Sequence, residues 1–237
     1  MTPAEQRRLL DDLEKRFVKG WRKEIADTIN SASQSYEQSG SYAVQVDRHA
    51  TNVAGLLQDT YLETGNAFAR PIYEKAHTRG IVTKDFENFQ ALIEAFIASA
   101  GAEKIKDISS TTKIQIQRVI RSGTQDGLSV PEIAANLRAK APLLSGFRAA
   151  LIARTETHTS SQWAQVTAIR DTGLQLRKEW VSAADERTRS NHRDANRQTV
   201  GMDESFTVGG EQLEFPGDPA GSAGNVINCR CVLNFVE

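Results

Sequence analysis

Both cysteines of this 237-residue chain lie in one tetrapeptide, Asn228-Cys229-Arg230-Cys231. His192 and Asp185 precede them in a stretch with many charged residues. Thiolate and imidazole are the ligands that zinc prefers, and a carboxylate can complete a tetrahedral set. A structural zinc site formed by His192, Cys229, Cys231 and Asp185 is therefore one interpretation of these residues.

Two other interpretations of the same residues stay open, because the one-residue spacer between the cysteines is shorter than is usual in structural zinc sites. In the first, which we favour over the zinc site, a cysteine packs in the core and His192 hydrogen-bonds to Asp185. In the second, His192 activates a cysteine thiolate, and the chain is a small metal- or thiol-dependent enzyme. A disulfide is not expected, because neighbouring side chains of a strand point to opposite faces.

The sequence lacks the motifs of several well-characterised catalytic sites. The His-x-Glu and Pro-Cys-x-x-Cys pair of zinc deaminases does not occur, and neither does a P-loop or a Gly-x-Gly-x-x-Gly. The glycines at Gly209-Gly210 and in the segment 217–224 are typical of turns. We therefore expect a protein that is not an enzyme.

Four arginines form a local basic cluster, at positions Arg187, Arg189, Arg193 and Arg197. Guanidinium groups bind phosphate in a bidentate manner, so contact with DNA is one interpretation. Acidic residues are interleaved with these arginines, which makes a solvated charged face the alternative. The formal net charge of the whole chain is -1, so attraction to nucleic acid would have to come from a local patch such as this one.

Arg154 and Glu156 lie two residues apart in a predicted helix, so their side chains do not face each other. Arg154 is therefore expected to find a different partner. The candidates are backbone carbonyl groups at the end of a strand and a carboxylate such as that of Asp185. We favour a structural ion pair that is at least half-buried over a functional role.

Two capping boxes mark the beginnings of helices. In Thr2-Pro3-Ala4-Glu5, Thr2 and Glu5 can satisfy each other's backbone N–H groups, and proline suits the first helical position. Ser129 and Glu132 repeat the signal later in the chain. Apolar residues follow the first box at spacings of three and four, which is typical of a helix with one buried face.

Glycine and proline predict where several helices end. We expect one helix to stop at Gly101 and a short one to stop at Pro142. A long helix should then run from Ser145 to about Thr172, with Gly173 as its C-terminal signal.

The pattern changes after this helix. Residues Lys178–Ser182 alternate like a strand, and residues 186–196 resemble a short charged helix. Residues 206–215 fit a hairpin, because Gly209-Gly210 tolerates the positive φ angles of tight turns. Residues 230–236 predict a final strand.

The fold class that follows is α+β. A mainly helical region over residues 1–144 should precede a small α+β domain with a short antiparallel sheet over residues 145–237. The hydrophobic fraction of 39% and charged fraction of 25% are those of a folded soluble protein. Apolar runs are too short to cross a membrane, and the first residues lack a signal-peptide core, so we expect folding in the cytoplasm.

The C-terminal part resembles the Mu F-like phage minor head (head morphogenesis) protein family. The resemblance is carried by Arg154-Thr155-Glu156, by Lys178-Glu179-Trp180 followed by residues 185–192, and by Pro216-Gly217-Asp218 leading into residues 228–231. These blocks stand in the family's order and at approximately its spacing. The resemblance implies a structural role for Arg154, Glu156, Trp180 and Asn228.

The resemblance also implies a non-enzymatic virion protein, present in few copies at the portal vertex or capsid interior. It implies a role in head assembly, DNA packaging or DNA ejection. Expected partners are the portal protein, capsid or scaffold proteins and double-stranded DNA, with no membrane, in the virion and in the host cytoplasm during assembly. The helical region would dock, and the C-terminal domain would present its arginines to DNA. The alternative is an enzyme of nuclease, peptidase or toxin type centred on His192, Cys229 and Cys231.

Overall fold

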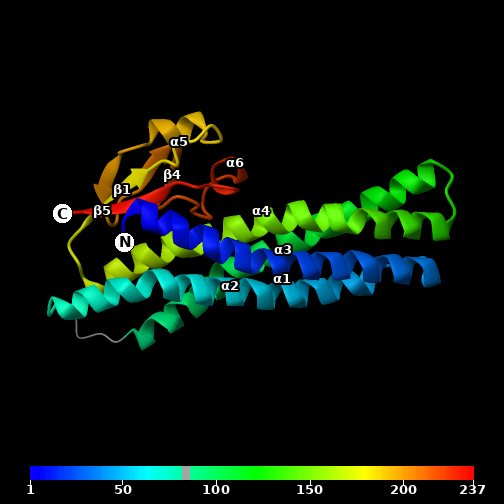
Figure 1. Cartoon of the computed structure of the whole chain (residues 1–237), viewed down its shortest axis with the longest axis horizontal. Coiled ribbons are helices and arrows are strands. Elements are labelled where there is room, and N and C mark those ends of the chain that lie inside the picture. Colours follow the sequence, from blue (N-terminus) through cyan, green and yellow to red (C-terminus); the bar gives the residue numbers. More distant parts are fainter. Residues whose placement is uncertain (82–85) are drawn as a thin grey trace. The chain divides into compact units, whose positions relative to one another are not determined.

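The computed structural model describes residues 1–81 and 86–237. Most of the fold is helical, as predicted, and four long helices account for it (Figure 1). Their bounds are α1 Pro3–Ser39, α2 Ala43–Thr78, α3 Glu87–Gln125 and α4 Val130–Thr172. None of the helices in the described part of the chain is long and apolar enough to span a membrane.

The predicted helix starts are confirmed in atomic detail. The backbone N–H of Thr2 donates to Glu5 Oε2 at 2.7 Å, and the N–H of Glu5 donates to Thr2 Oγ1 at 3.3 Å. At the second box, both the backbone N–H and the hydroxyl of Ser129 donate to Glu132 Oε2. These bonds satisfy donors that the first turn of a helix leaves without intrahelical partners.

Two predicted helix ends are wrong, because α3 continues through Gly101 and α4 continues through Pro142. In α4 the buried residues Leu137, Ala141, Ser145 and Ala149 recur at intervals of four on both sides of the proline, while Pro142 itself is exposed. A proline inside a helix costs about 3 kcal/mol. Burial of this continuous stripe offsets that cost, which is why the short helix and the long helix are one element.

The contacts divide the described chain into two compact units. The first contains residues 1–15, 60–97 and 154–237, and the second contains residues 16–59 and 98–153. Each of the four long helices therefore contributes one segment to each unit. The expected domain boundary between residues 144 and 145 lies inside α4 and stays a prediction. The contacts group the first fifteen residues with the C-terminal part of the chain instead.

The second unit is purely helical and contains a buried polar network. Its core includes Trp21, Ile25 and Leu57, which are almost completely buried. His49, with 1% of its surface exposed, lies within hydrogen-bonding distance of Thr28 Oγ1 through Nδ1 and of Thr112 Oγ1 through Nε2. Partners on both ring nitrogens explain how this histidine is tolerated in a helical core.

The first unit carries the predicted short antiparallel sheet. Strand β1 (Arg177–Val181) lies between β2 (Thr199–Gly201) and β5 (Val232–Val236), and both pairings are antiparallel. The hairpin of β3 (Phe206–Val208) and β4 (Glu211–Leu213) forms a second, two-stranded sheet (Figure 1). Its turn residues Gly209 and Gly210 have φ angles of 59° and 86°, as the predicted tight turn requires.

Two very short helices complete this unit, α5 (Ser190–Asp194) and α6 (Ala223–Val226). The charged helix predicted over residues 186–196 is therefore shorter than expected. The reason is a turn before it, in which the Thr188 hydroxyl donates to Asp185 Oδ1 at 2.7 Å and the Thr188 N–H donates to the Asp185 carbonyl. This side-chain bond competes with helix formation.

The free edge of β5 is covered by buried glutamine side chains from α1 and α4. The carbonyl of Leu233 accepts a hydrogen bond of 2.8 Å from Gln6 Nε2, and the N–H of Leu233 donates to Gln162 Oε1 at 2.9 Å. Both glutamines are fully buried. An uncovered strand edge exposes unpaired backbone groups, so these side chains take the place of a further strand.

Replacing Gln162 with leucine should therefore destabilise the protein by about 1–3 kcal/mol, because the buried N–H of Leu233 would lose its acceptor. Chemical denaturation measures the change in the free energy of unfolding. The control is Gln90→Leu on an exposed face of α3, which should change stability by less than about 0.5 kcal/mol. Equal effects of the two substitutions would contradict this account of the sheet edge.

Candidate metal centre and its surroundings

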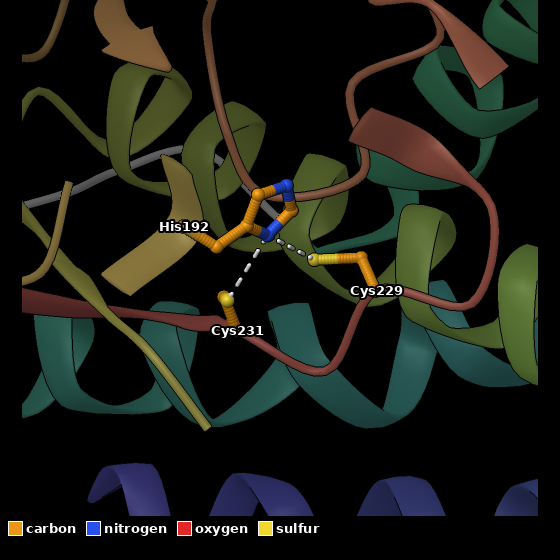
Figure 2. A group of neighbouring side chains, drawn as sticks. All are labelled: His192, Cys229 and Cys231. Carbon is orange, nitrogen blue, oxygen red and sulfur yellow. Dashed lines mark hydrogen bonds between the residues drawn. The ribbon is translucent and has the colours of Figure 1, made fainter. Parts of the chain in front are cut away.

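The three predicted ligands with nitrogen or sulfur donors lie together in the first unit. Their ligand atoms are within 4.8 Å of one another, and each residue has at most 2% of its surface exposed. His192 Nδ1 is 3.4 Å from Cys231 Sγ and 3.6 Å from Cys229 Sγ. Figure 2 shows the imidazole ring with this one nitrogen facing both sulfurs. The cysteines are free thiols, as expected.

Local backbone geometry brings the cysteines to the histidine. His192 belongs to α5, while both cysteines lie on the segment between α6 and β5. Asn228 turns this segment with a φ of 62°, and the N–H of Cys229 then donates to the Val226 carbonyl at 3.3 Å. Asparagine adopts such left-handed conformations more readily than most residues. The turn places both side chains on the same side, which a regular strand would not do.

Asp185 lies outside this cluster of three. Its Oδ1 accepts hydrogen bonds from the Thr188 hydroxyl and from the N–H of Arg187, and the bond from Thr188 lowers the pKa of the carboxyl group. The predicted hydrogen bond between His192 and Asp185 is wrong. The ring nitrogens of His192 face the two thiols and Asn225 instead. Asp185 only lines the cavity beside the cluster.

A second layer of side chains fixes the tautomer of His192. Its Nε2 is 3.3 Å from Asn225 Oδ1, and the same oxygen accepts a bond of 2.5 Å from Asn191 Nδ2. Because this oxygen acts as an acceptor, the proton of the neutral imidazole belongs on Nε2. Nδ1 then presents its lone pair to the two sulfurs, which is the arrangement of a metal-binding histidine.

The two thiols have unequal proton affinities. Burial raises the pKa of Cys229. A hydrogen bond from the Cys229 thiol lowers the pKa of Cys231 to about 4. Of the two thiols, Cys231 is therefore the one that loses its proton more readily.

His158 on α4 holds the cysteine segment from its other side and was not predicted. Burial lowers the pKa of His158, so the ring is neutral, and its Nε2 donates to the Cys231 carbonyl at 2.5 Å. Gly217, at a φ of 83°, packs against this ring, and a Cβ there would come within 2.6 Å of His158 Nδ1. The sequence did contain a signal for this role, because His158 lies four residues after Arg154 and so on the same face of the helix.

Arg154 forms an ion pair, but with Glu14 on α1 rather than with Asp185 or a strand carbonyl. Its Nη2 lies 2.5 Å from Glu14 Oε1, and its Nη1 donates to Asn228 Oδ1 at 2.7 Å. Glu156 faces elsewhere and accepts a bond of 2.9 Å from the Tyr61 hydroxyl, whose pKa is raised by burial. Trp180 is fully buried, and its ring packs edge-on against the His192 ring with 5.4 Å between the ring centroids.

The four arginines of the basic cluster divide into two groups. Arg187, Arg193 and Arg197 are exposed, and none of them has an ion-pair partner among the residues that the structure describes. Arg189 is half-buried and donates to the Ile227 carbonyl at 2.6 Å. Arg189 therefore supports the turn before the cysteines, while the other three are available to an external partner.

Two cavities adjoin the cluster. A small one of about 80 Å³ is lined by the three ligands and by residues that include Asp185, Arg187 and Arg189. A larger one of about 140 Å³ lies between α1, α4 and the cysteine segment and is lined by Arg7, Glu14, Arg154, His158 and Cys229 among others. Because the sulfurs are buried, a small cation could reach them through a narrow cavity, whereas a large substrate could not. The site therefore suits metal binding better than nucleophilic attack.

Comparison with known proteins identifies relatives of this part of the chain. The family model for Phage Mu protein F like protein matches residues 114–234. The chain is 30% identical over 125 residues to the uncharacterized protein YqbB of Bacillus subtilis, covering 51% of this chain and 41% of YqbB. It is 31% identical over 124 residues to the minor head protein GP7 of Bacillus phage SPP1, covering 51% of this chain and 40% of GP7.

A third relative has an enzymatic name. The NAD(+)--arginine ADP-ribosyltransferase EFV of Enterococcus faecalis is 32% identical over 116 residues, covering 47% of this chain and 23% of EFV. The chain thus spans less than half the length of each of these relatives. No solved structure matches the chain.

The family model covers about half of the chain and includes the second part of α3, all of α4 and the small sheets. It also contains the three clustered residues and every residue that holds the cysteine segment from α4. The chain belongs to the Phage Mu protein F like family.

Proposed function

We propose that this chain is a minor head protein of a tailed phage or prophage, incorporated into the virion and acting in head morphogenesis without catalysing a reaction. The observation that carries this proposal is the family match over residues 114–234, together with the similarity to minor head protein GP7. The burial of both thiols favours a structural role for the cysteine segment over that of a nucleophile.

The similarity to EFV does not extend the proposal to ADP-ribosyl transfer. The aligned region accounts for only 23% of that protein. Function resides in sites rather than in folds, so a shared region of this size is compatible with different activities of the whole proteins. An enzyme centred on His192, Cys229 and Cys231 remains the alternative, and ADP-ribosylation or hydrolysis by the purified wild-type chain would support it.

For the DNA-contact part of the proposal, the three exposed arginines are the best candidates. Arg187, Arg193 and Arg197 project from a stretch of eleven residues around α5 and have no acidic partner in the described structure. Exposed guanidinium groups without an ion pair are available for phosphate. Glu186 and Asp194 are exposed in the same stretch, so we expect modest affinity without sequence preference.

Changing Arg187, Arg193 and Arg197 together to glutamate should weaken binding to duplex DNA about tenfold or more. The plot of log affinity against log salt concentration should also become less steep, by an amount that corresponds to the loss of up to about three phosphate contacts. Fluorescence anisotropy across a series of salt concentrations measures both quantities. Arg189 is left intact because it supports the backbone at Ile227.

The control for this experiment carries the same change in net charge at three exposed basic residues elsewhere in the first unit, Arg8, Lys75 and Arg79. It should bind DNA with nearly the same salt slope as the wild type. If the two triple variants bind equally well, DNA contact by the arginine cluster is ruled out.

For attachment to the head, we propose docking of the helical part on the portal protein. Leu143 and Phe147, one helical turn apart on α4, each have 76% of their surface exposed. Two bulky apolar side chains on one helix face are the pattern with which helices bind in grooves of other proteins. A head protein must bind at least one other head protein, and this pair is the most exposed apolar feature of the described chain.

Replacing Leu143 and Phe147 with serine should leave the fold intact, because both are exposed, and should reduce incorporation into heads about tenfold or more, since interface anchors often contribute 2 kcal/mol or more. Quantitative mass spectrometry of purified particles measures the copy number in phage complemented with each variant. The control is Ile114→Ser with Val130→Ser, at less exposed positions of the same unit. Normal copy numbers with the Leu143 and Phe147 double variant would contradict the proposed docking surface.

A further inference from the structure

One nitrogen atom of His192 faces two sulfur atoms, which hydrogen bonding alone does not explain. Nδ1 is 3.4 Å from Cys231 Sγ and 3.6 Å from Cys229 Sγ. An imidazole nitrogen has a single lone pair or a single N–H in the ring plane, so it can make only one well-directed hydrogen bond. A cation placed between the three atoms would interact with all of them at once.

The two nitrogen-to-sulfur separations agree with a zinc tetrahedron, and all three ligand atoms lie within 4.8 Å of one another. Zinc binds thiolate sulfur at about 2.3 Å and imidazole nitrogen at about 2.1 Å, so a tetrahedral angle separates the nitrogen from each sulfur by about 3.6 Å. The observed separations are 3.4 and 3.6 Å. The imidazole would therefore need to move little relative to either sulfur to accept the ion.

The surroundings have the features of a built metal site. Asn225 and Asn191 leave the lone pair of His192 Nδ1 directed at the sulfurs, and ligating histidines are typically oriented in this way by a second layer of residues. His158 fixes the carbonyl of Cys231 from α4. Two thiolates would neutralise the charge of a divalent ion, so the loaded site would carry no net buried charge.

We propose that Cys229 Sγ, Cys231 Sγ and His192 Nδ1 bind one zinc ion, with a water molecule as its fourth ligand in the adjoining cavity of about 80 Å³. Both cysteines bind the ion as thiolates, and any proton that they still carry passes to solvent. Asp185 lines the same cavity but is occupied by the turn at Thr188, so it is not a ligand. The ion would connect α5 to the segment before β5. This inference is independent of the role proposed in the phage head.

Metal analysis of the purified full-length protein under reducing conditions tests the site directly. We expect about one zinc per chain in the wild type and less than about a tenth of that in Cys229→Ser and Cys231→Ser. Asp185→Asn is the matched control from the same cavity and should retain its zinc. Cobalt substitution should give an intense sulfur-to-metal charge-transfer absorption in the wild type and in Asp185→Asn.

Wild-type protein provides a test that does not depend on the variants being folded. Removal of zinc by a chelator should lower the melting temperature, and added zinc should restore it while added magnesium should not. Wild-type protein that takes up no zinc on reconstitution, or that melts at the same temperature with and without it, would overturn the proposal. Loss of zinc from Asp185→Asn would overturn the assignment of water as the fourth ligand.

The second layer gives a further quantitative expectation. Asn225→Ala should weaken zinc binding about 10- to 100-fold, because His192 loses the group that orients its ring. Competition with a chromophoric chelator measures the affinity. Asn234→Ala is the control, since Asn234 is a partly buried asparagine of the first unit that donates to Glu179 instead. An unchanged affinity in Asn225→Ala would show that the second layer does not orient His192.

Discussion

A row of polar side chains on one face of α4 holds the cysteine segment and β5 in place. Asn228 donates its N–H to Thr155, Cys231 accepts from His158, and Leu233 donates to Gln162. Thr159 adds a bond to the carbonyl of Gly217. These α4 residues are all buried. A helix face of this kind gains little from the hydrophobic effect, and its value lies in satisfying backbone groups that irregular segments leave unpaired.

This row explains why Arg154-Thr155-Glu156, well before the sheet, is one of the blocks that carry the family resemblance. Arg154 and Thr155 both bind Asn228, the residue whose left-handed backbone turns the two cysteines toward His192. The helix therefore fixes the position of the turn and of the cysteines after it, although up to 74 positions separate the bonded partners. A substitution in this part of the helix would change the positions of the sulfurs through the turn.

Local signals in the sequence were sufficient for those elements that depend on neighbouring residues. The capping box at Thr2, the tight turn at Gly209-Gly210 and the end of α4 before Gly173 are all present. They could be predicted because the groups that satisfy each other are only a few residues apart. The clustering of His192 with both cysteines was also foreseen, from ligand chemistry rather than from spacing.

Features that depend on distant contacts could not be predicted in this way. Pro142 interrupts the local signal, but the buried stripe on α4 continues across it. The ion pair between Arg154 and Glu14 and the bond between Gln6 and Leu233 join residues more than a hundred positions apart. Strand β2 has only three residues, too few for a recognisable alternation. In each case tertiary packing decides what the local sequence leaves open.

Because the sheet region is small, a metal ion at the proposed site would add stability that its core alone supplies only in part. Its strands have three to five residues, and its core is correspondingly small. A cross-link between His192 and Cys231 closes a loop of 39 positions, and in the chain-entropy model a closure of this length stabilises by about 4 kcal/mol. The two cysteines are only two positions apart on one segment, so almost all of this gain comes from the link to His192 on α5. The ion would therefore stabilise the sheet region mainly by holding α5 to the cysteine segment.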